Sequence, residues 1–79
     1  MDNTQENVSK VLIEVKKNIE PNLASTTLVT DGILDSLDIM NLIMRLENAF
    51  DIEIDPEDVL SENFESVAAI MSLIDKCRG

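Results

Sequence analysis

Apolar residues recur every three or four positions in several segments of the chain, which is the spacing of one face of an α-helix. The first segment runs from about residue 4 to residue 19. Pro21 is expected to end this helix, because the residue before a proline is biased out of the helical region. The apolar stripe of the segment consists of Val8, Leu12, Val15 and Ile19, widened by Val11 and Ile13.

Residues 20–34 lack this spacing and contain serine, threonine and glycine, which disfavour helix interiors. We therefore expect a long loop here. Loops of this length inside a compact domain are uncommon and are often functional. Four apolar residues should pin the loop to the core: Leu23, Leu28, Ile33 and Leu34.

Three further helices are expected after the loop. The second helix should run over residues 36–50, with Asp35 as its N-cap and Asp38 three residues later. A short helix is expected over 56–60, where Pro56 suits a first helical position. The last helix should run over 65–76, and its inward residues are Val67, Ile70, Met71 and Ile74.

No segment alternates in the manner of a β-strand. The predicted fold is therefore all-α: a small four-helix bundle with three main helices, one short helix and a long loop between the first two main helices. A chain of 79 residues is long enough for one domain, so residues 1–79 are expected to form a single domain.

The helix expected over 36–50 has two apolar faces. At 100° per residue, the larger face should point to the core; it contains Ile39, Leu42, Ile43, Leu46 and Phe50. The second face consists of Leu37, Met40 and Met44, with polar residues around it: Asp38, Asn41, Glu47 and Asn48. Either the preceding loop covers this second face, or it is an exposed docking surface. Methionine suits a docking surface because its flexible side chain fits several partners.

The charge of the chain narrows the choice of partner. Sixteen acidic residues against six basic ones give a net charge of −10. This charge repels nucleic acid and anionic lipid, and it attracts proteins with basic patches. Hydrophobic residues make up 44% of the chain and recur at helical spacing, which argues against a disordered acidic segment.

The sequence bears on the location of the protein through its cysteine content and its apolar segments. Cys77 is the single cysteine, so no internal disulfide is expected. The first residues do not resemble a signal peptide, and no apolar stretch approaches the ~20 residues of a membrane span. A monomeric, cytoplasmic protein is therefore expected.

Residues 51–62 place acidic side chains at positions 1, 3, 5, 7 and 12 of a possible EF-hand calcium loop. Position 6, however, normally needs a glycine, and here it is Pro56, whose φ is fixed near −65°. Position 9 is Val59, which has no side-chain oxygen. We expect a solvated acidic surface and no metal site.

Ser36 lies where the long loop meets the second helix. The first N–H groups of a helix lack internal partners, and the helix dipole makes this end partly positive, so a phosphate group is favoured there. An Asp-Ser pair before a helix is common, and taken alone it usually indicates only ordinary helix capping. The chain has no histidine, which excludes a Ser-His-Asp triad. No catalytic residue is expected, and any chemistry at Ser36 must be done by another protein.

The residues around Ser36 resemble the acyl carrier protein family. The resemblance begins with the run Asp-Gly-Ile-Leu-Asp-Ser-Leu-Asp at 31–38. It continues through Leu42, Leu46 and Glu47 to Phe-Asp-Ile-Glu-Ile at 50–54, and then through Pro56, Phe64 and Val67. It covers nearly the whole chain.

The resemblance implies a function and a set of partners. Ser36 would receive a 4'-phosphopantetheine arm from a phosphopantetheinyl transferase, with Asp35 and Leu37 flanking the attachment site. The arm would carry acyl groups as thioesters in fatty-acid, polyketide or a specialised acyl pathway. Acyl-loading and acyl-transfer enzymes with basic patches would bind the second face of the helix, and the residues expected to contact them are Leu37, Asp38, Met40, Met44 and Glu47.

Two alternatives remain at the level of sequence. The pair Ile33-Leu34 stands where the family often has small residues, a variant that resembles specialised carriers and D-alanyl carriers. A D-alanyl or aminoacyl carrier is therefore one alternative. The other is an unmodified acidic helical module that binds partners through the second face alone.

Overall fold

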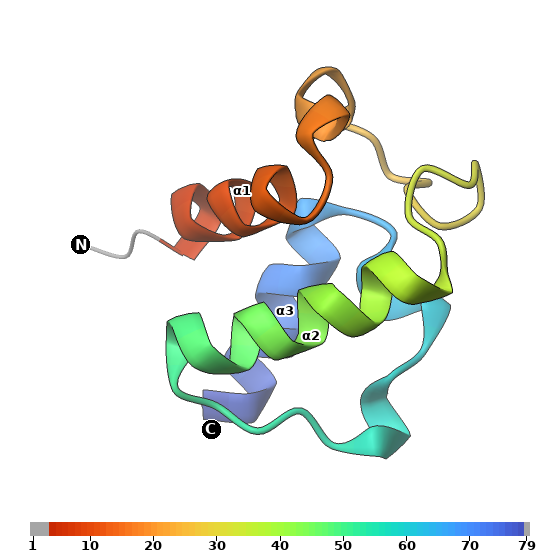
Figure 1. Cartoon of the computed structure of the whole chain (residues 1–79). Coiled ribbons are helices and arrows are strands. Elements are labelled where there is room, and N and C mark those ends of the chain that lie inside the picture. The colour runs from red at the N-terminus through yellow and green to blue at the C-terminus, as the bar shows by residue number, and fades with distance from the viewer. Residues whose placement is uncertain (1–3, 79) are drawn as a thin grey trace.

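The computed structural model describes residues 4–78, and these residues form an all-helical structure (Figure 1). The three α-helices are α1 (Thr4–Val15), α2 (Ser36–Phe50) and α3 (Val67–Arg78). Three short 3-10 helices lie between them: η1 (Lys17–Asn22), η2 (Pro56–Asp58) and η3 (Ser61–Phe64). No strand occurs in the described range, so the predicted all-α fold with a long loop before the second main helix is confirmed.

A single apolar core joins the three α-helices, and α1 packs against both α2 and α3. Each helix contributes most of the face that its apolar spacing predicted, but in α3 Leu73 is buried although it was not predicted, and Met71 is only partly buried. Residues completely shielded from solvent include Val8 and Leu12 of α1, Leu42 and Leu46 of α2, and Ile70 and Ile74 of α3. Ile39, Ile43 and Phe50 of the predicted core face of α2 are only partly buried and pack around the edge of this core.

The first helix ends four residues earlier than the sequence predicted, and Pro21 is not the residue that ends it. α1 stops at Val15, because Lys16 takes an extended conformation (φ −145°, ψ 103°) that turns the chain. Pro21 lies inside η1, so a 3-10 helix accommodates it. The turn at Lys16 still allows Ile19 to reach the core, where it is fully buried.

The loop between η1 and α2 is attached to the core at the predicted residues. Leu28 and Leu34 are buried, and Leu23 and Ile33 are partly buried against the core. A backbone hydrogen bond from the Leu34 N–H to the Leu28 carbonyl (2.9 Å) closes the loop on itself. Within it, Gly32 has a positive φ of 75°, a conformation that glycine adopts without steric cost.

Glu65 fixes this loop to the rest of the molecule. Its carbonyl oxygen accepts a hydrogen bond from the Leu28 N–H (2.9 Å). Its carboxylate accepts from the N–H groups of Val29 (2.8 Å) and Thr30 (2.9 Å), and from the Thr30 hydroxyl. Four donors of one turn are thus satisfied by one residue that lies about 35 positions away in the sequence.

This role of Glu65 explains why the last helix starts later than predicted. The sequence predicted a helix over 65–76, whereas α3 covers Val67–Arg78. Because Glu65 is engaged with the loop, the helix starts two residues later than predicted and is capped by the Ser66 hydroxyl, which accepts from the Ala69 N–H (3.0 Å). The short helix predicted over 56–60 also differs from the structure. Two 3-10 helices, η2 and η3, lie in this region, and Val59 and Leu60 separate them.

We predict that the stabilising effect of Glu65 depends on pH. The hydrogen bonds from Thr30 and Val29 outweigh desolvation and lower the pKa of Glu65 below its usual value of 4.5. As the pH falls, the carboxyl group of Glu65 is therefore protonated at a higher pH in the unfolded chain than in the folded one. The stabilisation is fully present above about pH 4.5 and is lost as the pH falls through the lowered pKa. In urea unfolding, Glu65→Gln should be less stable than the wild type at pH 7, and the difference should shrink below pH 4.5.

Glu62→Gln is the matched control. Glu62 is exposed on the neighbouring η3, and its substitution removes the same charge as Glu65→Gln. It should be close to the wild type at both pH values. Equal effects of the two substitutions would show that net charge, and not the contact with the loop, is responsible.

Candidate functional site

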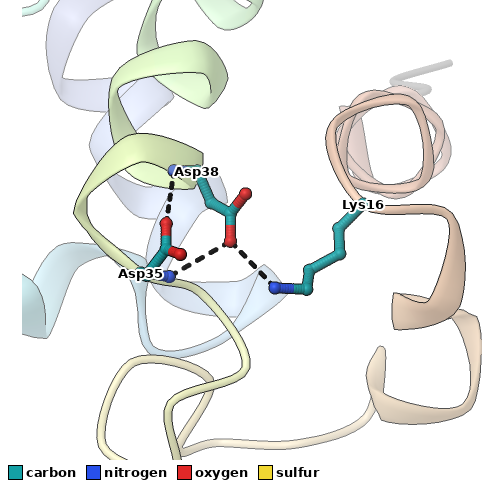
Figure 2. Close-up of polar contacts among 3 residues, drawn as sticks. All are labelled: Lys16, Asp35 and Asp38. Atoms are coloured by element: carbon teal, nitrogen blue, oxygen red, sulfur yellow. Dashed lines mark hydrogen bonds and ion pairs between the residues drawn. The ribbon is translucent and has the colours of Figure 1, made fainter.

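The start of α2 is fixed by a reciprocal pair of hydrogen bonds between two aspartates (Figure 2). Asp35 is the N-cap, and its Oδ1 accepts from the Asp38 N–H (2.8 Å). Asp38 Oδ2 accepts in return from the Asp35 N–H (3.2 Å). This is a capping box, and it defines the first turn of the helix at the residues that the sequence predicted.

A lysine from the end of α1 completes this arrangement. The Lys16 ammonium lies 3.0 Å from Asp38 Oδ2, the same oxygen that caps the helix (Figure 2). Burial would raise the pKa of Asp38, but the hydrogen bonds from Lys16 and Asp35 and the charge of Lys16 outweigh it and lower the pKa. Asp38 is therefore ionised at neutral pH, and its side chain is only 16% exposed.

Ser36 is the first residue of α2 and is exposed to solvent. Its hydroxyl makes no hydrogen bond to the described part of the chain. Of the N–H groups in the first helical turn, that of Asp38 is capped, whereas those of Ser36 and Leu37 have no acceptor within the helix. A phosphate attached to the Ser36 oxygen would lie beside these donors, at the positive end of the helix dipole.

The second apolar face of α2 is exposed. Leu37, Met40 and Met44 are 67%, 64% and 62% exposed. The loop before α2 does not cover them, so the alternative in which it would bury this face is wrong. The first of these three residues, Leu37, directly follows Ser36, and together they form an apolar surface beside it.

The two acidic residues predicted to lie on the partner surface are both engaged inside the chain. Asp38 is bonded to Lys16 and Asp35, as described above. Glu47 Oε2 accepts from the Ile54 N–H (2.9 Å) and so holds the segment that follows α2. Neither carboxylate is therefore a freely exposed charge.

A small hollow adjoins Ser36 and Met40, between α2 and the segment containing η3. It has a volume of about 260 Å³. Its lining consists of Ser36, Ile39, Met40, Val59, Leu60, Ser61 and Phe64. Apart from the two hydroxyls, these side chains are apolar, so the hollow would favour an apolar group attached near Ser36.

Sequence reasoning missed two parts of this site. Val59 and Leu60 were assigned to a helix without a functional role, although they are 40% and 48% exposed and line the hollow. Two adjacent apolar residues after an acidic run were the signal that could have indicated an exposed site. The contact of Lys16 with Asp38 spans 22 positions and leaves no pattern in the sequence.

The acidic segment after α2 forms no metal site within the described range. No group of three or more acidic, cysteine or histidine side chains in residues 4–78 is placed to hold a metal ion. Pro56 starts the 3-10 helix η2 at the position where an EF-hand needs its sharp turn. Over the same residues, no helix has the length and apolar character needed to cross a membrane.

Known proteins resemble this chain over almost its full length. Residues 10–74 match the family model described as a phosphopantetheine attachment site. Acyl carrier protein of Buchnera aphidicola subsp. Baizongia pistaciae is 35% identical over 77 residues, which is 96% of each chain. Acyl carrier protein of Buchnera aphidicola subsp. Schizaphis graminum is 37% identical over 59 residues, or 73% of this chain and 75% of that one.

A third relative, from a different genus, covers the chain end to end. Acyl carrier protein of Akkermansia muciniphila is 32% identical over 80 residues, which is 99% of this chain and 98% of that one. No solved structure matches this one significantly. The similarity to these relatives therefore rests on the comparison of amino-acid sequences.

We predict that the Asp35 cap contributes measurably to stability. Asp35→Ala removes the acceptor for the Asp38 N–H and should lower the free energy of unfolding by about 1 kcal/mol. Asp35→Asn keeps a capping oxygen and should cost much less, since asparagine is also a preferred N-cap residue. Urea unfolding of both variants at pH 7 measures the difference; similar losses for the two substitutions would contradict the capping role.

Proposed function

The chain belongs to the acyl carrier protein family, and we propose that it carries acyl groups as thioesters on a 4'-phosphopantetheine arm attached to the Ser36 hydroxyl. Phosphopantetheine is the group that gives the matching family model its description. Asp35 and Leu37 flank the attachment point. The acyl group would be bound to the distal thiol of the arm.

The observation that supports this assignment best is the position of the Ser36 hydroxyl. It is exposed, has no hydrogen-bond partner in the described chain, and lies at the first residue of a well-capped helix. A phosphodiester formed there keeps its negative charge near unpaired N–H groups and the positive end of the dipole. The capping box holds this turn in place.

The chain would be the substrate of the modifying enzyme and not a catalyst. It has no histidine, and the two carboxylates nearest Ser36 in sequence are hydrogen-bonded within the cap. A phosphopantetheinyl transferase must therefore supply the group that removes the Ser36 proton. Acyl-loading and acyl-transfer enzymes would then act on the thiol of the arm.

The exposed apolar face formed by Leu37, Met40 and Met44 would be the surface that the acyl-loading and acyl-transfer enzymes bind. It lies directly beside the proposed attachment point, so a partner docked there reaches the base of the arm. Apolar contacts would supply much of the affinity. The net charge of −10 would favour encounter with enzymes that carry basic patches.

The cargo is proposed to be an acyl chain in fatty-acid, polyketide or a specialised acyl pathway. The apolar hollow beside Ser36 supports an apolar cargo better than an aminoacyl one. Ile33-Leu34, which had suggested a specialised or D-alanyl carrier, has a structural explanation. Leu34 is 1% exposed and lies in the core, and Ile33 packs against the core, so both residues contribute to the packing of the loop.

We predict that Ser36 is the attachment residue. The chain is co-expressed with a broad-specificity phosphopantetheinyl transferase, and its intact mass is measured by mass spectrometry. The wild type should gain the mass of one phosphopantetheine, and Ser36→Ala should gain none. The unmodified helical module, in contrast, would gain nothing under conditions that modify a control carrier.

Ser61→Ala is the matched control for this experiment. Ser61 is exposed and is the other residue with a hydroxyl that lines the same hollow as Ser36. This variant should be modified as completely as the wild type. Loss of modification in Ser61→Ala with retention in Ser36→Ala would move the attachment site to Ser61.

A further inference from the structure

Lys16 lies in an unusual place for a basic residue of this acidic chain. It follows the last residue of α1, and its N–H donates to the Leu12 carbonyl (2.9 Å) to complete that helix. Its extended backbone then directs the side chain across to the first turn of α2, where the ammonium meets Asp38 (Figure 2). The neighbouring Lys17 is exposed and makes no ion pair in the described chain.

The ion pair changes what Asp38 can offer to another protein. Asp38 Oδ2 receives two donors, the Lys16 ammonium at 3.0 Å and the Asp35 N–H at 3.2 Å. Only 16% of the Asp38 side chain is exposed, compared with 38% of that of Lys16. A basic group of a partner that approaches the start of α2 therefore meets a carboxylate that is mostly buried and already paired with the Lys16 ammonium.

The ion pair between Lys16 and Asp38 contributes little to the stability of the fold. Ion pairs between partly exposed side chains contribute little to the free energy of unfolding, and salt screens them. The cap of α2 also persists without Lys16, because the two hydrogen bonds between Asp35 and Asp38 do not involve it. The larger consequence is electrostatic, since Lys16 neutralises the carboxylate two residues from Ser36.

We propose that Lys16 is a specificity-determining residue that masks Asp38 from basic partner enzymes; this inference rests on the proposed attachment of the arm at Ser36. An enzyme that binds the start of α2 through a cationic side chain must displace the Lys16 ammonium to reach Asp38. Enzymes that rely on the apolar face formed by Leu37, Met40 and Met44 do not face this competition. Lys16 thus weakens binding by partners that recognise charge at this turn.

The test uses the full chain without its arm, a broad-specificity phosphopantetheinyl transferase and a phosphopantetheine donor. KM and kcat for arm attachment are measured for the wild type, Lys16→Gln and Lys17→Gln. Lys17→Gln makes the same change in net charge without freeing Asp38. Lys16→Gln should lower KM about two- to fivefold relative to Lys17→Gln, with kcat unchanged. A change in KM of this size matches the strength of an exposed ion pair.

Three further measurements separate masking from a general effect on structure. Lys16→Arg keeps the pair and should have the KM of the wild type. In an Asp38→Asn background, Lys16→Gln and Lys17→Gln should have the same KM. The advantage of Lys16→Gln should also shrink as salt is raised.

Equal KM values for Lys16→Gln and Lys17→Gln would overturn the inference, as would a higher KM or a change confined to kcat. Failure of the proposed function has a different signature, because the wild type would then gain no phosphopantetheine at all. A wild type that is modified, together with equal KM values for the two glutamine variants, would leave Ser36 as the attachment site and reject only the masking by Lys16.

Discussion

The position of the loop that leads to α2 depends on the hydrogen bonds that Glu65 makes at residues 28–30. That loop has only short 3-10 structure before it and leads directly into Ser36. Its backbone donors cannot pair within a regular element, and unpaired donors near the core are costly. Glu65 satisfies several of them at once and thereby joins the loop to the beginning of α3. With Leu28 and Leu34 buried beneath it, the loop delivers the chain to a defined place where α2 can begin.

The site that results combines a rigid first turn with an exposed hydroxyl. The mutual hydrogen bonds of Asp35 and Asp38 use the acidic residues of this turn for capping, so they are not spread as free charge around Ser36. Lys16 neutralises Asp38 further. The exposed face that follows Ser36 is therefore mainly apolar, although the chain as a whole is strongly acidic. Charge would act at long range to bring partners together, and contact at this face would be made largely by apolar side chains.

Features set by neighbouring residues were predictable from the sequence, and features set by distant contacts were not. The bounds of α2 follow from the cap at Asp35 and from the apolar spacing of residues 36–50, so expectation and structure agree there. The second apolar face also followed from helical geometry, because one helix cannot bury two opposite faces in one small core. Its exposure did not follow from the sequence, which left open whether the preceding loop covers it. The early end of α1 at Lys16 and the late start of α3 after Glu65 have a different origin. Both residues make hydrogen bonds to segments more than 20 positions away, and no periodicity indicates such contacts. Pro21 misled for a related reason, since a 3-10 helix tolerates a proline that an α-helix would not.

The central claim is that a phosphate is attached to the Ser36 oxygen at the start of α2. Through-bond correlation of phosphorus and proton resonances in the modified protein tests it most directly, because the coupling passes only through covalent bonds. We expect the phosphorus of the arm to couple to the β-protons of Ser36, and the amide protons of Ser36 and Leu37 to shift as they meet the new negative charge. Coupling of the phosphorus to the β-protons of any other residue would contradict the assignment.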